Sequence, residues 1–160
     1  MTGRCRGIWL GWLLLCLAAC QRPPSSECFV RVSEAADGEY VFPADFSDSL
    51  CRYDLFLYTR VDRNVWQFRS FPGVQLALNW ESPTRVCYAD TVLLCPSAVS
   101  HSSFFSQDFR LPYRADVVPF ELGNWTIRAR FLNDSDAIKG LRGLGLQVVR
   151  KPGEVQHGTR

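Results

Sequence analysis

Val74-Gln75-Leu76-Ala77-Leu78-Asn79-Trp80 decides the fold class of this 160-residue chain. Large apolar side chains occupy every second position, and small or polar side chains lie between them. Strict alternation of this kind is typical of a β-strand with one buried face, because a helix would repeat its apolar positions every three to four residues. The stretch therefore predicts a strand in an antiparallel sheet with one face on the core.

Similar runs flank this stretch in both directions, and turn signals separate them about every 8–12 residues. Strands are expected at 28–32, 40–42, 50–61, 90–94, 125–131 and 144–149, with a less regular run at 104–111. The intervals 62–72 and 96–103 are expected to be loops, and 133–140 a loop or one helical turn. The second face of 50–61 is half aromatic, so we expect it to be partly covered. No stretch has a helical period long enough to connect parallel strands.

These elements predict an all-β fold, namely a two-sheet antiparallel β-sandwich of immunoglobulin-like or jelly-roll-like type. The expected core consists of the large side chains on the inward positions of the clearest strands. They are Leu55, Leu57, Leu76, Leu78, Trp80, Trp125, Ile127, Leu146 and Val148.

The first 19 residues have the composition of an export signal. Arg4 and Arg6 precede an apolar run, Ile8 to Ala19, which is shorter than the roughly 20 residues that a membrane span needs. The run ends in Leu17-Ala18-Ala19-Cys20, which resembles a bacterial lipobox. That resemblance implies cleavage before Cys20 and lipidation of its sulfur. The alternative is a plain secretory signal cut near Ala19, which would leave Cys20 as an ordinary thiol.

The remaining chain is divided into a tether, a domain and a tail. Residues 20–27 are expected to be a polar tether, 28–150 the β-sandwich domain, and 151–160 a disordered tail. Residues 1–19 contain two arginines and no acidic residue, so the rest carries 16 basic and 16 acidic side chains. A neutral domain has no basic field to attract nucleic acid, and nucleic acid is excluded as a partner.

Four cysteines remain in the domain: Cys28, Cys51, Cys87 and Cys95. In an exported chain they are compatible with two disulfides, and equally with four buried thiols. Cys87 and Cys95 can pair only if the chain reverses between them, since one extended strand would separate them by about 26 Å. No Cys-x-x-Cys spacing indicates a zinc site.

Candidate catalytic and metal-binding residues are few. His101 lies in Ser100-His101-Ser102-Ser103 without a nucleophile motif beside it, and His157 lies in the tail. Asp134 and Asp136 do not have the glycine and distal glutamate of a calcium-binding loop. We therefore expect a protein that is not an enzyme and needs no cofactor or metal.

Aromatic residues concentrate in or beside the predicted loops. We expect them to fold back as small buried clusters, whereas exposed rings would suit a sugar or a protein partner. A lipid-anchored carbohydrate-binding module using these loop aromatics is therefore the alternative function. The residues concerned are Trp66, Phe68, Phe71, Phe104, Phe105 and Tyr113.

An ordered set of motifs from residue 50 to 150 resembles the GldH family of Bacteroidota lipoproteins, named for gliding motility. The motifs are Tyr53–Arg60, Val74–Trp80, Asp90-Thr91-Val92, Leu122–Ile127 and Ile138–Leu146. The last of these, with its Gly-Leu-x-Gly-Leu-Gly-Leu ending, is the most distinctive. Its glycines indicate a close backbone approach and not a phosphate loop.

The resemblance implies a lipid-anchored β-sandwich of the cell envelope that assists a larger assembly through protein–protein contacts, with no catalytic residues. In gliding relatives that assembly is a motility apparatus coupled to protein secretion. Known sorting patterns place an acidic residue just after the lipidated cysteine for inner-membrane retention or surface export. Gln21-Arg22-Pro23-Pro24 has none, which implies an outer-membrane anchor facing the periplasm.

Short acceptor patterns for glycosylation also occur. Asp48-Ser49-Leu50 and Asp90-Thr91-Val92 resemble the O-glycosylation acceptor of Bacteroidota, with Ser49 and Thr91 as the modified residues. Thr91 facing the core is the alternative for the second. Asn124 and Asn133 match the N-glycosylation pattern, which a bacterial lipoprotein would rarely use.

Overall fold

A computed structural model describes residues 24–62, 73–95, 98–132 and 139–153. Within these ranges the chain forms β-strands and a short 3-10 helix at Val32–Glu34. The strands are β1 (Ser25–Arg31), β2 (Glu39–Asp45), β3 (Cys51–Val61), β4 (Val74–Glu81), β5 (Cys87–Leu94), β6 (Val99–Ser102), β7 (Gln107–Val117), β8 (Asn124–Phe131) and β9 (Gly143–Pro152). No helix in the described ranges is long and apolar enough to cross a membrane.

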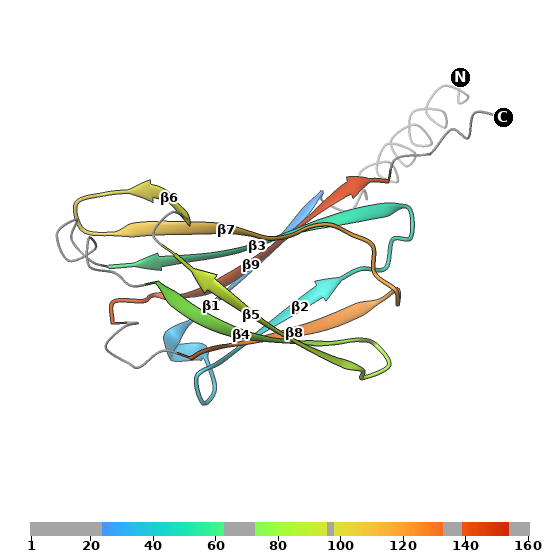
Figure 1. Cartoon of the computed structure of the whole chain (residues 1–160), viewed down its shortest axis with the longest axis horizontal. Helices are drawn as coiled ribbons and strands as arrows, with labels where there is room; N and C mark the ends of the chain where they lie inside the picture. Colours follow the sequence, from blue (N-terminus) through green and yellow to red (C-terminus); the bar gives the residue numbers. More distant parts are fainter. Residues whose placement is uncertain (1–23, 63–72, 96–97, 133–138, 154–160) are drawn as a thin grey trace, which may run out of the picture.

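The strands form two antiparallel sheets that pack face to face as a β-sandwich (Figure 1). One sheet has the order β1-β9-β3-β7-β6, and the other has the order β2-β8-β4-β5. The expected all-β sandwich is confirmed. The five-stranded sheet is the wider of the two, and β5 is a free edge of the four-stranded sheet.

The core lies between the sheets and follows the alternation read from the sequence. In β4, Val74, Leu76 and Leu78 are buried while Gln75 and Asn79 face solvent. All nine predicted core residues pack there, Trp80 being the one that stays partly exposed. Strand β2 also contributes side chains to the core, although the predicted core contained none from 40–42. Among them Phe42 is completely buried.

Strand β3 has one buried face and a second face that is partly covered, as its composition predicts. It lies between β7 and β9, and Leu55 and Leu57 point into the core. Asp54, on its other face, is nearly buried and forms an ion pair with Lys151. The Asp54 carboxylate also accepts a hydrogen bond of 2.9 Å from the backbone N–H of Asp116. These contacts, the Lys151 bond first, lower the pKa of Asp54 below its ordinary value.

Several predicted boundaries differ from the structure. Strand β1 begins at Ser25, so the end of the expected tether 20–27 already belongs to the sheet, and β9 continues to Pro152, two residues into the expected tail. β6 lies inside the interval 96–103 that was expected to be a loop. Its residues Val99–Ser102 have no alternating pattern, and main-chain pairing with β7 holds them extended. Tertiary pairing here overrides local composition.

Candidate functional site

An aromatic pocket of about 290 Å³ lies at one end of the sandwich, between edge strand β5 and strand β7. The segment 118–123, which connects β7 to β8, closes its outer side. Aromatic and aliphatic side chains form most of the wall, with one acidic and one basic residue. The lining residues are Phe46, Trp80, Tyr88, Ala89, Asp90, Tyr113, Arg114, Val117, Val118, Pro119, Phe120 and Trp125.

Ring contacts fix the shape of this aromatic pocket. Trp125 lies at its centre, with ring centroids 5.0 Å from Phe120, 6.2 Å from Trp80 and 6.4 Å from Tyr88. Phe120 also meets Tyr88 nearly edge to face, at 5.3 Å. Trp80 is near the end of β4 and Trp125 near the start of the adjacent antiparallel β8, so pairing brings both rings to the same end of the sheet. Edge-to-face packing of this kind stabilises the rings beyond the area they bury.

The polar atoms of the aromatic pocket form one connected chain of hydrogen bonds. Trp80 Nε1 donates to the Tyr113 hydroxyl at 2.9 Å, and that hydroxyl donates to Asp90 Oδ2 at 2.9 Å. Arg114 Nη2 donates to the same oxygen at 2.6 Å, and the backbone N–H of Thr91 donates to Asp90 Oδ1 at 2.8 Å. The chain ties β5 to β7 across the gap between the two sheets.

Burial and hydrogen bonding shift the pKa values of the two acidic groups in these hydrogen bonds, Tyr113 and Asp90. Burial, followed by the bond to Asp90, raises the pKa of Tyr113 to about 12. Burial acts to raise the pKa of Asp90, but the bonds from Tyr113, Arg114 and the Thr91 amide together hold it below its ordinary value. At neutral pH the site therefore contains a protonated phenol and an ionised carboxylate, and both are hydrogen-bonded to neighbouring protein groups.

This arrangement is suited to binding an apolar ligand. The polar groups described above bond to one another, which leaves ring faces and aliphatic surface for a ligand. His101 is exposed on edge strand β6 and does not line the aromatic pocket. Among the described residues no three His, Cys, Asp or Glu side chains lie close enough to hold a metal ion.

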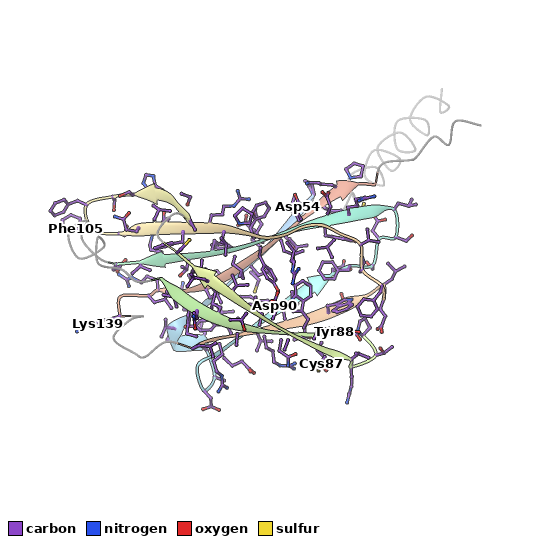
Figure 2. All side chains as sticks on the ribbon, in the orientation of Figure 1. Asp54, Cys87, Tyr88, Asp90, Phe105 and Lys139 are labelled. Carbon is purple, nitrogen blue, oxygen red and sulfur yellow. The ribbon has the colours of Figure 1, made fainter. Side chains whose placement is uncertain are left out.

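Exposed apolar side chains continue outward from the aromatic pocket. Tyr88, Val118, Phe120 and Leu122 form what we call the apolar rim, in which Phe120 is 62% exposed. The β4–β5 turn supports this rim, because Thr84 Oγ1 bonds to the Glu121 carboxylate at 2.7 Å. Figure 2 shows Tyr88 at one end of the sandwich and Phe105 at the other.

The four predicted cysteines of the domain all carry thiols and lie on different strands or strand ends. Cys87 is the first residue of β5, and Cys95 follows its last residue. Because β5 runs without reversal, these two cysteines cannot form a disulfide with each other. Cys28 and Cys51 lie opposite Leu146 and Pro152 of β9, six positions apart along that strand. The structure contains thiols at all four positions, but none is buried as the thiol alternative expected: Cys28, Cys51 and Cys95 are half-buried and Cys87 is exposed.

The predicted glycosylation acceptors lie at the surface. Ser49 is exposed in the turn before β3, and Thr91 is exposed on edge strand β5. The alternative in which Thr91 faces the core is wrong, because Asp90 and Val92 hold the inward positions of β5 opposite Leu78 and Leu76. Both hydroxyl groups therefore stay predicted acceptors.

The loop aromatics behave in different ways. Phe104 and Phe105 are exposed, which makes the expectation of burial wrong for these two residues. Their rings meet at 83°, so they do not form one flat surface. Tyr113 is half-buried and belongs to the aromatic pocket. The other predicted residues lie outside the described ranges: Cys20, Trp66, Phe68, Phe71, Asn133, Asp134, Asp136 and His157.

The glycines of the closing run fill the structural role expected of them. Gly145 lies opposite Tyr58, and a Cβ built there would be 2.2 Å from the Tyr58 ring. Gly143 faces Val30, whose carbonyl oxygen would be 2.3 Å from a Cβ. Close approach of neighbouring strands and rings therefore requires glycine at both positions.

Sequence reasoning missed most of the aromatic pocket. Val118 and Phe120 were not singled out, because 112–122 contains neither a clear alternation nor a turn motif. Tyr88 was missed because the strand was expected to begin at Asp90, whereas β5 begins at Cys87. The one signal available was Asp90, the sole charged residue in the apolar strand β5. A lone carboxylate among apolar residues indicates a partner across the fold, here Arg114.

Comparisons with known proteins leave the family of this chain open. No family model matches the sequence, and no curated protein matches it. The fold is similar to part of the crystal structure of dimeric latent PorU from Porphyromonas gingivalis, at 10% identity and a TM-score of 0.33. That similarity covers 74% of this chain and 10% of the PorU chain, and a likeness this weak carries no functional argument.

Proposed function

We propose that this chain is a non-enzymatic, lipid-anchored protein of the cell envelope that assists a larger assembly through protein–protein contacts. The anchor at Cys20, the outer-membrane location facing the periplasm and the relation to the GldH lipoproteins are inferred from the sequence. The contact surface is inferred from the fold, and it is the apolar rim together with the aromatic pocket behind it.

The exposure of Tyr88, Val118 and Phe120 around one pocket is the observation that carries the proposal. Scattered apolar residues are normal on a protein surface, but a grouped set beside a pocket is typical of an interaction site. Aromatic residues are also enriched where protein interfaces gain most of their binding energy. The polar atoms of the aromatic pocket are already bonded to one another, so an apolar partner surface could cover them without leaving them unpaired.

A capture experiment tests the contact surface. The tagged full chain is expressed in its bacterial host, cross-linked and recovered from gently solubilised membranes. We expect envelope proteins to be recovered with the wild-type chain and lost with Phe120→Asp, which places a charge in the apolar rim. Leu132→Asp is the matched control, since Leu132 is 53% exposed and lies just past the opposite end of β8. Equal recovery with all three chains would contradict the proposal.

A labelling experiment tests the anchor separately. Cells fed a labelled fatty acid should incorporate it into the wild-type chain but not into Cys20→Ala. Cys87→Ala is the control, because Cys87 is an exposed thiol that the lipobox does not include. Unchanged labelling of Cys20→Ala would refute the anchor and leave the contact surface to be judged by the capture experiment.

A further inference from the structure

A second surface, separate from the aromatic pocket, lies on the outer face of the five-stranded sheet. It is an open depression of about 900 Å³, which we call the outer-face depression. Strand β1 contributes Glu27 and Phe29 on one side, and the β6–β7 region contributes Ser100 and Phe105 on the other. Tyr58 of β3 lies on its floor between them. The depression shares no lining residue with the aromatic pocket.

Two aromatic rings on this floor have nearly parallel planes. Phe29 and Tyr58 both pair with Gly145 of the strand between them, and their ring centroids are 5.8 Å apart at an interplanar angle of 27°. The missing side chain at Gly145 lets the Tyr58 ring settle against the backbone, where a Cβ would be only 2.2 Å away. Phe29 remains 39% exposed. The two rings together present a shallow aromatic platform.

Planar polar side chains surround the platform and hold one another in place. Arg60 makes a two-pronged contact with Asp108, from Nε at 2.6 Å and from Nη2 at 2.8 Å. Across the platform, Arg110 Nη2 donates to Gln147 Oε1 at 2.5 Å, and Gln147 Nε2 donates to Glu27.

The position of Arg110 is fixed from below as well as from the side. Its guanidinium group lies 3.9 Å from the centre of the Phe56 ring. Fixed groups of this kind lose little side-chain entropy when they bind a ligand. Both hydrogen-bond donors and acceptors are therefore available beside the rings in set positions.

The charges of the outer-face depression balance. Arg60, Arg110 and Arg142 face Glu27, Asp62 and Asp108, so three positive charges meet three negative ones. A surface with this balance has no net field to attract an acidic or a basic polymer. It complements an uncharged ligand that can both donate and accept hydrogen bonds.

We propose that the outer-face depression binds a neutral glycan. A sugar ring has one face of polarised C–H groups, which the negative face of an aromatic ring attracts, and a rim of hydroxyl groups. The Phe29–Tyr58 platform would take the C–H face, while Arg110, Gln147 and Glu27 would bond to the hydroxyls. This ligand class uses both halves of the surface, and the proposal does not depend on the contact role assigned to the apolar rim.

Saturation-transfer NMR on the full chain tests the proposal. The probes are cellohexaose, maltohexaose, mannohexaose and N-acetylchitohexaose, which are all neutral, with polygalacturonate as the anionic comparison. We expect transfer to the ring protons of at least one neutral probe and none to polygalacturonate. The absence of transfer to all four neutral probes would overturn the proposal, and so would a preference for polygalacturonate.

Variants locate the binding surface. Tyr58→Ala should weaken binding about tenfold, since ring stacking and burial contribute on this scale. Gln147→Leu leaves the platform in place and should also weaken binding, which keeps the test sound if Tyr58→Ala is poorly folded. Phe120→Asp in the apolar rim is the control and should bind like the wild-type chain. Binding that is unchanged in both Tyr58→Ala and Gln147→Leu would refute the assignment to this face.

Discussion

Replacement of Gly145 by alanine tests how the five-stranded sheet holds its aromatic platform. A Cβ at this position would lie 2.2 Å from Cζ and 2.5 Å from Cε1 and Cε2 of Tyr58. Carbon atoms in favourable contact are about 3.5–4.0 Å apart, so the ring has to lift away from the strand. Lifting separates Tyr58 from Phe29, with which it now stacks at 5.8 Å.

The net effect combines a loss with a smaller gain. Disrupting an aromatic pair costs about 0.5–1.5 kcal/mol, and overpacking of a well-packed site costs about 1–3 kcal/mol. Alanine is better than glycine in a strand interior by about 0.5–1 kcal/mol. Because the losses exceed the gain, Gly145→Ala should lower the free energy of unfolding by about 0.5–4 kcal/mol.

The prediction becomes sharper when Tyr58 is also replaced. In a Tyr58→Ala background the ring that the new Cβ would strike is absent, and the gain in strand propensity is left. Gly145→Ala should then raise the free energy of unfolding by about 0.5–1 kcal/mol. The effect of one substitution therefore changes sign with the identity of the residue opposite it, and the coupling equals the lost contacts, about 1.5–4.5 kcal/mol.

Urea unfolding followed by tryptophan fluorescence measures all four chains of this cycle. Tyr113→Ala gives the matched background, because Tyr113 lies in the aromatic pocket and has no contact with Gly145. There Gly145→Ala should cost as much as in the wild-type chain. If it destabilises the Tyr58→Ala chain as much as the wild type, the Tyr58 ring does not depend on the glycine, and the reasoning about the platform is wrong.

Three further predictions concern buried charge, pH and thiols. Asp54→Ala should lower the free energy of unfolding, measured in urea, by about 1–3 kcal/mol. The substitution removes a nearly buried carboxylate that accepts a hydrogen bond from a backbone N–H and forms an ion pair with Lys151. Asp108→Ala on the outer face is the comparison and should cost less than about 1 kcal/mol. The folded-state pKa values of Asp54 and Asp90 lie below their unfolded values. Their contribution to stability is therefore complete above the unfolded pKa and is lost as pH falls through the folded-state pKa. Acid unfolding should show this loss of stability, and Asp54→Asn should make the loss smaller. In the native chain Cys87 should react with a maleimide before Cys28, whose pKa is raised by burial, and Cys87→Ser should remove the fast phase in mass spectrometry; equal rates would contradict this order.

Alternating strands could be predicted from the sequence because burial on one face leaves a direct trace in composition. β4 and β8 were expected at 74–80 and 125–131 and occur at Val74–Glu81 and Asn124–Phe131. β6 could not be predicted, since main-chain pairing with β7 defines it and its own side chains carry no pattern. A strand can thus be predicted from the sequence where one of its faces packs on the core. It cannot be predicted where only main-chain pairing at a sheet edge holds it extended.

Neither candidate surface could be assembled from the sequence, for a different physical reason. The aromatic pocket joins Tyr88 of β5 to Phe120 of a connection, and the platform joins Phe29 of β1 to Tyr58 of β3. Each of these pairs is far apart in the chain and depends on sheet order, which alternation does not determine. Only the glycines of β9 hinted at the platform, because close approach is what a glycine in a strand permits.

The outer-face depression begins close to the proposed anchor. β1 begins at Ser25, opposite Val149 near the end of β9, and Glu27 and Phe29 of this strand line the depression. Ser25 lies five positions after Cys20, and a fully extended chain of that length spans at most about 18 Å. A lipid on Cys20 would therefore keep the Glu27 side of the depression near the membrane. The depression extends from there toward Phe105, which lies at the other end of the sandwich from Tyr88 (Figure 2). Because the tether would crowd the Glu27 side, a glycan should enter the depression from the Phe105 side.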